Sequence, residues 1–372
     1  MLGRIEDFAL ERYFARWEFA VRHQLSASDV EPLSMSELLA LADPESRARW
    51  DSLTLGYTES MGLPDLRAEI ARTYANLDPK HVLVVAGAEE GIFLSMLASL
   101  SPGEHAVVVT PAYQSLHAIP RTAGASVTMV PLLHETGWLL DVDAVERAIT
   151  RHTRLLAINF PHNPTGSHID ENTMRRLAKL ATDARIMLFS DEVYRGLEYL
   201  PGDTVTAAAD LSATAVSLGV MSKAYALAGI RIGWLATQNE AWLDRVARLK
   251  DYTTICSSAP SEILALIALR AREQVLSRSR SIVAANLEHA NRFFAARQDA
   301  VDWVAPRAGS VAFPRLLAGN ATDVSTRLAE HESALLLPGT VFGADAAHFR
   351  LGLGRRDFPV AIERLGKILA DS

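Results

Sequence analysis

Short runs of apolar, often β-branched residues alternate with amphipathic stretches through the middle of the chain. The runs predict strands and the stretches with helical spacing predict helices. Several of the strands are apolar throughout, which is typical of a mostly parallel sheet with helices covering both faces. We therefore predict an α/β fold with strands at 81–86, 106–110, 126–132, 155–160, 186–190, 215–221 and 230–237 and helices at 89–100, 114–124, 141–150 and 171–182.

The pattern changes after residue 260, where two long helical patterns are followed by short apolar runs around Val311, Leu335 and Phe349 and a last helix from Asp357. Residues 1 to about 50 show no strand pattern, and we expect them to pack against this C-terminal part. The sequence thus predicts a large domain at 50–260 and a smaller α+β domain formed by both termini, at 1–49 and 261–372.

Composition narrows the classes of protein to consider. The chain has 372 residues, a net charge of -7 and a pI near 5.9, so it lacks the basic surface that nucleic acids and anionic membranes attract. No apolar stretch reaches about 18 residues and the opening residues are acidic and mixed, so we expect a cytoplasmic protein. Cys256 is the only cysteine, which excludes an internal disulfide, and we predict no metal site.

Lys223 stands directly after the apolar run 215–221, where a hydrated ammonium group is badly placed. Desolvation lowers the pKa of a lysine and frees its amine to form a Schiff base, whereas a lysine that snorkels from a strand end would have no chemical role. Ser222 and Arg231 flank it, and their hydroxyl and guanidinium groups could share one phosphate.

Two other strand ends carry possible ligand contacts. Small residues at 87–91 begin a helix whose free amides would suit a phosphate, although a plain tight turn is equally compatible with the sequence. Tyr113 follows a proline turn and could stack on a flat heterocycle, or it could simply fill the core.

Asn163 and Asp191 follow the next strands of the predicted sheet. Two Xaa-Pro bonds in the segment 159–166 impose a rigid turn on Asn163, whose amide could donate to a phenolate-like oxygen or form an Asx turn. Asp191 ends an apolar strand and needs a cationic partner, which could be a protonated pyridine nitrogen or an arginine such as Arg185.

The order of these motifs resembles that of fold type I pyridoxal-phosphate enzymes of the class I/II aminotransferase family. The similarity runs from about residue 50 to 355 and includes Asn-Pro-Thr-Gly at 163–166, Asp191 with Tyr194, Ser222-Lys223 and Gly-Ile-Arg-Ile-Gly at 229–233. It implies that pyridoxal 5'-phosphate is the cofactor and that Lys223 forms the Schiff base.

The resemblance also implies a role for each matching residue. Asp191 would pair with the pyridine nitrogen, Asn163 and Tyr194 would bind the ring oxygen, and Tyr113 would stack on the ring. The phosphate would be held by Ala88, Glu89, Ser222 and Arg231, and the substrate carboxylate by Arg350. Tyr57 would reach the phosphate of a neighbouring subunit, which implies a homodimer with shared active sites.

The resemblance implies an aminotransferase that moves the amino group of a free α-amino acid to a keto acid. An alternative is elimination and cyclisation of a substituted guanidino amino acid, because residues 251–256 and 310–313 resemble the branch of cyclases such as capreomycidine synthase. In that case Glu18 or Glu59 would bind the guanidinium. A regulator that has lost catalysis is disfavoured, since the chain has no helix-turn-helix appendage or basic region.

Some positions depart from the family pattern or adjoin predicted site residues. Val220 stands where many relatives have serine or glycine, so one phosphate contact is missing or replaced. The aromatic segment 8–19 could form a lid over the substrate, although helix packing is the commoner use of such a pattern. His162 and His348 have no acid or cysteine at catalytic or metal-ligand spacing, so we expect structural roles for both.

Overall fold

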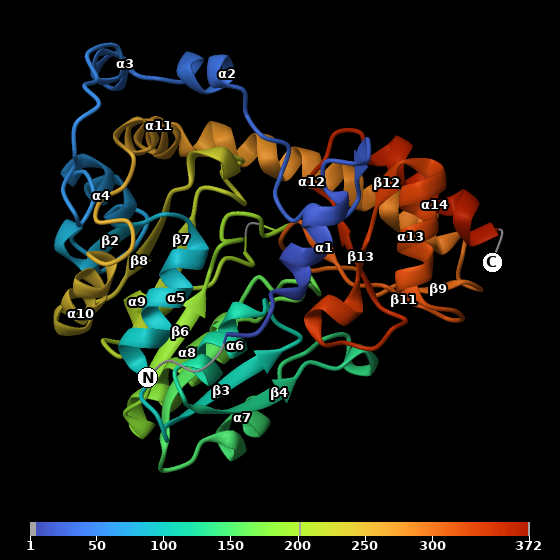
Figure 1. Cartoon of the computed structure of the whole chain (residues 1–372), viewed down its shortest axis with the longest axis horizontal. Coiled ribbons are helices and arrows are strands. Elements are labelled where there is room, and N and C mark those ends of the chain that lie inside the picture. The colour runs from blue at the N-terminus through green and yellow to red at the C-terminus, as the bar shows by residue number, and fades with distance from the viewer. Residues whose placement is uncertain (1–4, 201, 371–372) are drawn as a thin grey trace.

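The computed structural model describes residues 5–200 and 202–370, and a seven-stranded sheet forms its centre (Figure 1). The strand order is β2-β8-β7-β6-β5-β3-β4, and neighbouring strands are parallel except that β8 runs antiparallel to β7 and β2. The predicted α/β fold with a mostly parallel sheet is confirmed. The strands are β2 (Val82–Val85), β3 (His105–Thr110), β4 (Ser126–Pro131), β5 (Thr153–Asn159), β6 (Met187–Asp191), β7 (Ala215–Val220) and β8 (Gly233–Ala236).

Helices cover both faces of this sheet because its strands are apolar on both sides. Along β3, Ala106 and Val108 pack into one apolar cluster, while Val107 and Val109 pack into another. Since successive side chains of a strand point to opposite faces, the two clusters are the two layers of the core. The first contains α5 (Ala88–Ser99), α6 (Ser115–Thr122) and α10 (Glu240–Lys250), and the second α7 (Val142–Ala148) and α8 (Glu171–Ala184). The short helix α9 (Ala208–Leu211) contacts β7.

The strand predicted at 230–237 begins later than the sequence suggested. Residues Ala228–Ile230 form the 3-10 turn η3, and Arg231 adopts a left-handed backbone conformation with φ of 55°. An extended strand cannot include that conformation, so β8 begins at Gly233. The turn leaves Arg231 at the edge of the sheet instead of inside it.

Helix starts near this edge differ in how they are capped. Asp141 and Asp170 accept hydrogen bonds from the third residue of α7 and of α8, at Ala144 and Thr173. Such caps satisfy amides that would otherwise have no partner in the helix. Helix α5 instead follows Gly87, and no side chain caps its first amides.

The C-terminal part has the predicted α+β pattern. Strands β10, β14 and β13 form an antiparallel sheet, and α13 packs against α14. The strands expected around Val311, Leu335 and Phe349 are present. The elements are α11 (Ala259–Arg270), α12 (Arg272–Ala295), β9 (Val301–Asp302), β10 (Val311–Ala312), β11 (Arg315–Leu316), α13 (Ala321–Glu332), β12 (Ala334–Leu335), β13 (Leu337–Pro338), η4 (Gly339–Phe342), β14 (Phe349–Gly352) and α14 (Phe358–Ala370).

The N-terminal residues pack against C-terminal elements, as expected from the sequence. Helix α1 contacts η4, β1 pairs with β12, and α2 and α3 contact α11. Helix α11 also contacts α4 and η3, so it touches both predicted domains and the division at residue 260 stays a prediction. These N-terminal elements are α1 (Ala9–Trp17), β1 (His23–Gln24), α2 (Met35–Ala40), α3 (Pro44–Asp51) and α4 (Pro64–Ala71). Between residues 5 and 370, residue 201 aside, no helix has the length and apolar character needed to cross a bilayer.

Candidate active site

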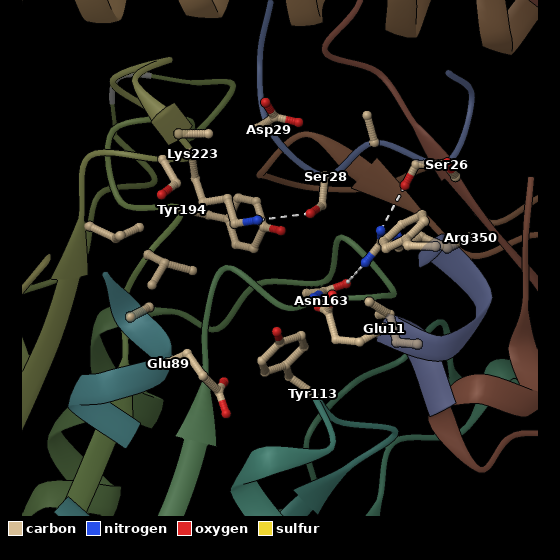
Figure 2. Close-up of a pocket in the computed structure, with 18 of the residues that line it drawn as sticks. Glu11, Ser26, Ser28, Asp29, Glu89, Tyr113, Asn163, Tyr194, Lys223 and Arg350 are labelled. Atoms are coloured by element: carbon tan, nitrogen blue, oxygen red, sulfur yellow. Dashed lines mark hydrogen bonds between the residues drawn. The ribbon is translucent and has the colours of Figure 1, made fainter. Parts of the chain in front are cut away.

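A cavity of about 420 Å³ lies at the C-terminal ends of the parallel strands, where α/β sheets bind their ligands. Its walls come from the large sheet, from β14 and from the N-terminal segment, which are far apart in the sequence (Figure 2). The cavity brings together ten of the predicted site residues: Ala88, Glu89, Tyr113, Asn163, Asp191, Tyr194, Ser222, Lys223, Arg231 and Arg350.

Lys223 extends into the cavity from the loop that follows β7, whose residues are all buried. Its Nζ donates a hydrogen bond of 2.9 Å to Ser28 Oγ (Figure 2). Burial lowers the pKa of Lys223, and the nearby cations Arg350 and Arg231 lower it too, while Asp29 and Asp191 raise it. A lowered pKa increases the fraction of free amine, which is the nucleophilic form.

Asp191 ends β6 inside the cavity and is only 4 % exposed. Its carboxylate accepts a hydrogen bond of 3.2 Å from the amide of Val193, and no ion pair joins it to Arg185 or to any other described residue. Burial raises the pKa of Asp191 to about 7, although Lys223 nearby lowers it. The site therefore holds a buried acid that lacks a cationic partner.

Arg350 and Asn163 meet on the opposite wall. Arg350 Nη1 donates to Asn163 Oδ1 at 3.1 Å and Nη2 donates to the carbonyl oxygen of Ser26 at 2.7 Å (Figure 2). Its Nε has no hydrogen-bond partner among the described residues, although Arg350 is 1 % exposed. A buried guanidinium with an unused N–H group can bind a carboxylate.

The start of α5 and Arg231 form a small cradle for an anion. A Cβ added to Gly87 would lie 2.5 Å from Arg231 Nη2, so the guanidinium lies directly over the uncapped helix start. Uncapped amides and a guanidinium both favour negative charge. Ser222 adds a hydroxyl group to this wall, and Val220 adds only an apolar surface, as its sequence position implied.

Two tyrosines and one glutamate complete this part of the cavity. The Tyr194 hydroxyl is buried, and burial raises its pKa to about 12, while Arg350 and the nearby hydroxyl of Ser28 act to lower it. The Tyr113 ring packs at 55° against Phe8, with 5.1 Å between centroids. The Glu89 carboxylate accepts hydrogen bonds from Ser115 Oγ, at 2.6 and 2.8 Å, so only the backbone amide of Glu89 is suited to a phosphate.

The N-terminal segment forms a wall of the cavity, for which the sequence had suggested only Glu18 and a lid at residues 8–19. Glu11, Glu18, Ser28 and Asp29 all line it, and burial raises the pKa of Glu18. In this structure the segment 8–19, suggested as a lid, forms part of the cavity wall, and its movement stays a prediction. Asn159 was also missed: it donates to the Asp191 carbonyl oxygen at 2.9 Å and accepts from the amide of Asn163 at 2.8 Å.

Two predicted residues lie outside this cavity. Tyr57 is 92 % exposed, and Glu59 is exposed in the same loop, so neither lines the cavity of its own chain. The role suggested for Glu59 in binding a guanidinium group therefore stays a prediction that would need a neighbouring subunit. In this loop Thr58 Oγ1 donates a hydrogen bond of 3.2 Å to the carbonyl oxygen of Ser257.

The two histidines next to site residues lie outside the cavity. His162 is bonded to Thr165 Oγ1 at 2.8 Å, and burial lowers the pKa of His162 to about 3. His348 contacts Asp345 at 2.7 Å and His134 at 3.3 Å. The expectation that His348 has no nearby acid is wrong, because Asp345 lies three residues before it across a tight turn.

Comparison with known proteins assigns the family. The model of aminotransferase class I and II matches residues 28–364. The chain belongs to this family.

Capreomycidine synthase of Streptomyces vinaceus is 32 % identical over 352 residues, 94 % of this chain and 88 % of that protein. Arginine–pyruvate transaminase AruH of Pseudomonas aeruginosa is 30 % identical over 91 % of this chain and 90 % of that protein. The solved structure of the pyridoxal-phosphate-dependent cyclase OrfR superposes with a TM-score of 0.90 at 29 % identity, covering 100 % of this chain and 99 % of that one.

Family membership makes the chain an enzyme that uses pyridoxal 5'-phosphate, and the cavity fits this cofactor. The cradle of Gly87 and Arg231 suits a phosphate. The unpaired carboxylate of Asp191 suits a protonated pyridine nitrogen, and the amine of Lys223 suits an aldehyde.

The buried acid gives a prediction about stability in the cofactor-free chain. Because the pKa of Asp191 rises from its ordinary value of 3.8 to about 7 in the folded chain, the folded chain holds this proton more tightly. The unfolding free energy therefore falls as the pH rises from about 4 to 7, by about 1.4 kcal/mol per pH unit at most. Asp191→Asn should thus be more stable than the wild type at pH 8, with a difference that narrows towards pH 5.

Urea unfolding of the cofactor-free chains across this pH range measures the difference. Asp323→Asn, an exposed change on α13, is the control and should show no such pH dependence. A stability difference for Asp191→Asn that stays constant with pH would contradict the assignment.

Proposed function

We propose that this chain is a cytoplasmic aminotransferase that uses pyridoxal phosphate to move the amino group of a free α-amino acid to a keto acid. The observation that carries the proposal is that one cavity holds the amine of Lys223, the carboxylate of Asp191 and the guanidinium of Arg350. These are the groups needed to attach the cofactor, keep its ring protonated and hold an α-carboxylate.

The proposed cofactor contacts follow from the positions of the side chains. Ser222, Arg231 and the amides of Ala88 and Glu89 lie around the cradle and would hold the phosphate. Tyr113 would lie against the ring face. The hydroxyl of Tyr194 and the amide of Asn163 would bind the ring oxygen, and the place of both residues in the cavity wall supports this role.

Arg350 would bind the α-carboxylate of the substrate, because its side chain lines the cavity. Asn163 and the carbonyl of Ser26 fix the guanidinium in one orientation, which in turn fixes the direction of the substrate's Cα–H bond. When bound, pyridoxal phosphate supplies an electron sink for the negative charge that develops at Cα. Lys223 Nζ would take up the Cα proton, for which its lowered pKa is favourable.

A second candidate function is elimination and cyclisation of a guanidino amino acid. It is favoured by the carboxylates of Glu11 and Glu18, which line the cavity opposite the sheet and would attract a guanidinium. The similarity to capreomycidine synthase and to the cyclase OrfR supports the same reading. Both reactions begin with loss of the Cα proton, so the same residues would serve either one.

The exposed loop with Tyr57 supports a homodimer with shared active sites. Leu55, Tyr57, Tyr252 and Ile255 are exposed by 85, 92, 91 and 53 %. Thr58 and Ser257 join the two loops that carry them. Large apolar groups gathered at one place are typical of a surface that another protein covers. In the proposed dimer Tyr57 would contact the phosphate bound by the partner.

Transamination predicts a half-reaction in the absence of keto acid. Mixing the cofactor-loaded enzyme with a panel of amino acids should convert the absorbance of the lysine-bound cofactor to that of the amine form. One keto acid should be released per active site, because the amino group stays on the enzyme. Keto acid is measured by mass spectrometry. A panel that includes basic amino acids and yields no keto acid would contradict transamination, and a cyclic product would instead support the second candidate.

Recognition of a cationic side chain predicts a selective effect of Glu18→Gln. The variant should raise KM for arginine by about 10- to 100-fold, the usual cost of losing a charge-assisted hydrogen bond. KM for norleucine, which has no charge on its side chain, should stay the same. Steady-state kinetics with both amino acids measure the effect, and Glu363→Gln on α14 is the control. Equal changes for arginine and norleucine would show that Glu18 does not recognise the charge.

A further inference from the structure

The backbone of residues 25–31 is pressed against the end of β14 and the residues after it. A Cβ added to Gly352 would lie 1.9 Å from the carbonyl oxygen of Ala27, and one added to Gly354 would lie 2.1 Å from that of Asp29. Hydrogen bonds join Gly352 N to Leu25 O at 2.6 Å and Glu31 N to Gly354 O at 2.8 Å. Only glycine at these two positions permits so close an approach, so the N-terminal segment has a fixed place at the cavity.

Within this segment Ser28 is held from two sides. Its carbonyl oxygen accepts a hydrogen bond of 2.8 Å from Ser310 Oγ, and its hydroxyl accepts the bond from Lys223 Nζ at 2.9 Å. The neighbouring Asp29 accepts a hydrogen bond of 2.8 Å from Arg355 Nη2 instead of from the lysine. In the described part of the chain Ser28 Oγ is therefore the acceptor for the ε-amine, across 195 residues of sequence.

We propose that Ser28 is a positioning residue for Lys223, which holds the ε-amine at the cavity wall whenever that amine is not bonded to the cofactor. This inference rests on one part of the proposed function, namely that Lys223 binds the aldehyde of pyridoxal phosphate. It applies equally to transamination and to cyclisation, since the amine is released in both.

The chemistry of the two groups explains why a hydroxyl is placed there. An ammonium group is a stronger donor than an amine, so an acceptor at 2.9 Å stabilises the protonated form more than the neutral one. Burial acts in the opposite direction on Lys223. Ser28 thus partly offsets the lowering of the Lys223 pKa by burial, and it directs the lone pair of Nζ away from the N-terminal segment. Because a hydroxyl group carries no charge, it does not bind the lysine permanently.

The test measures capture of pyridoxal phosphate by the full-length chain after its own cofactor has been removed with hydroxylamine. The rate at which the lysine-bound absorbance appears is followed between about pH 6 and 9.5, a range that spans the titration of a lysine whose pKa is lowered. Ser28→Ala should move the midpoint of this profile down by about 0.5 to 1 pH unit, roughly a three- to tenfold change in the amine fraction. Ser28→Thr, which keeps the hydroxyl, should retain the wild-type midpoint.

Ser26→Ala is the matched control, because Ser26 lies in the same segment and its hydroxyl donates to Gln24 at 3.1 Å instead of contacting the lysine. Ser28→Cys keeps the side-chain volume with a weak acceptor, so it should shift the midpoint in the same direction even if Ser28→Ala folds poorly. An unchanged midpoint in Ser28→Ala and Ser28→Cys, or an equal shift in Ser26→Ala, would overturn the proposal. If none of the chains captures pyridoxal phosphate, both this proposal and the cofactor assignment are overturned. If the midpoint shifts as expected but no amino acid yields a keto acid, only the proposed transamination is overturned.

Discussion

The chemistry proposed for this cavity depends on one buried amine, that of Lys223, which water cannot fully hydrate. Lys223 follows a strand of buried residues, and burial lowers its pKa. The same environment raises the pKa of Asp191 to about 7, and no side chain in residues 5–200 and 202–370 forms an ion pair with it. These are unfavourable arrangements for folding, and they are typical of sites where a ligand supplies the missing partners.

The N-terminal segment closes this cavity and joins its two halves. Ser26 and Ser28 contact Arg350 and Lys223, so one short segment touches both the group proposed to hold the substrate and the group proposed to do the chemistry. Its position is set by close backbone contact with Gly352 and Gly354. A displacement of the backbone of this segment would therefore alter substrate binding and proton transfer together.

The sheet and much of the cavity could be predicted because local patterns encode them. Lys223, Asp191 and Asn163 each follow an apolar strand, and parallel strands end at the same edge of a sheet, so the residues after them must meet. Ser28 could not be found in this way, and Glu18 was suggested only through the resemblance to the cyclases. They belong to a segment without strand pattern, and only its long-range packing against β14 brings it to the cavity. The start of β8 was misplaced because nothing in the sequence marks the left-handed conformation of Arg231, a non-glycine residue.

The central claim is that the amine of Lys223 is the one that binds the cofactor. Reducing the cofactor-loaded enzyme with borohydride, digesting it and locating the label by mass spectrometry tests this claim directly. We predict a single pyridoxyl group on the peptide that contains Lys223. A label on Lys250, which is 1 % exposed and also has a lowered pKa, or the absence of any label, would contradict the account.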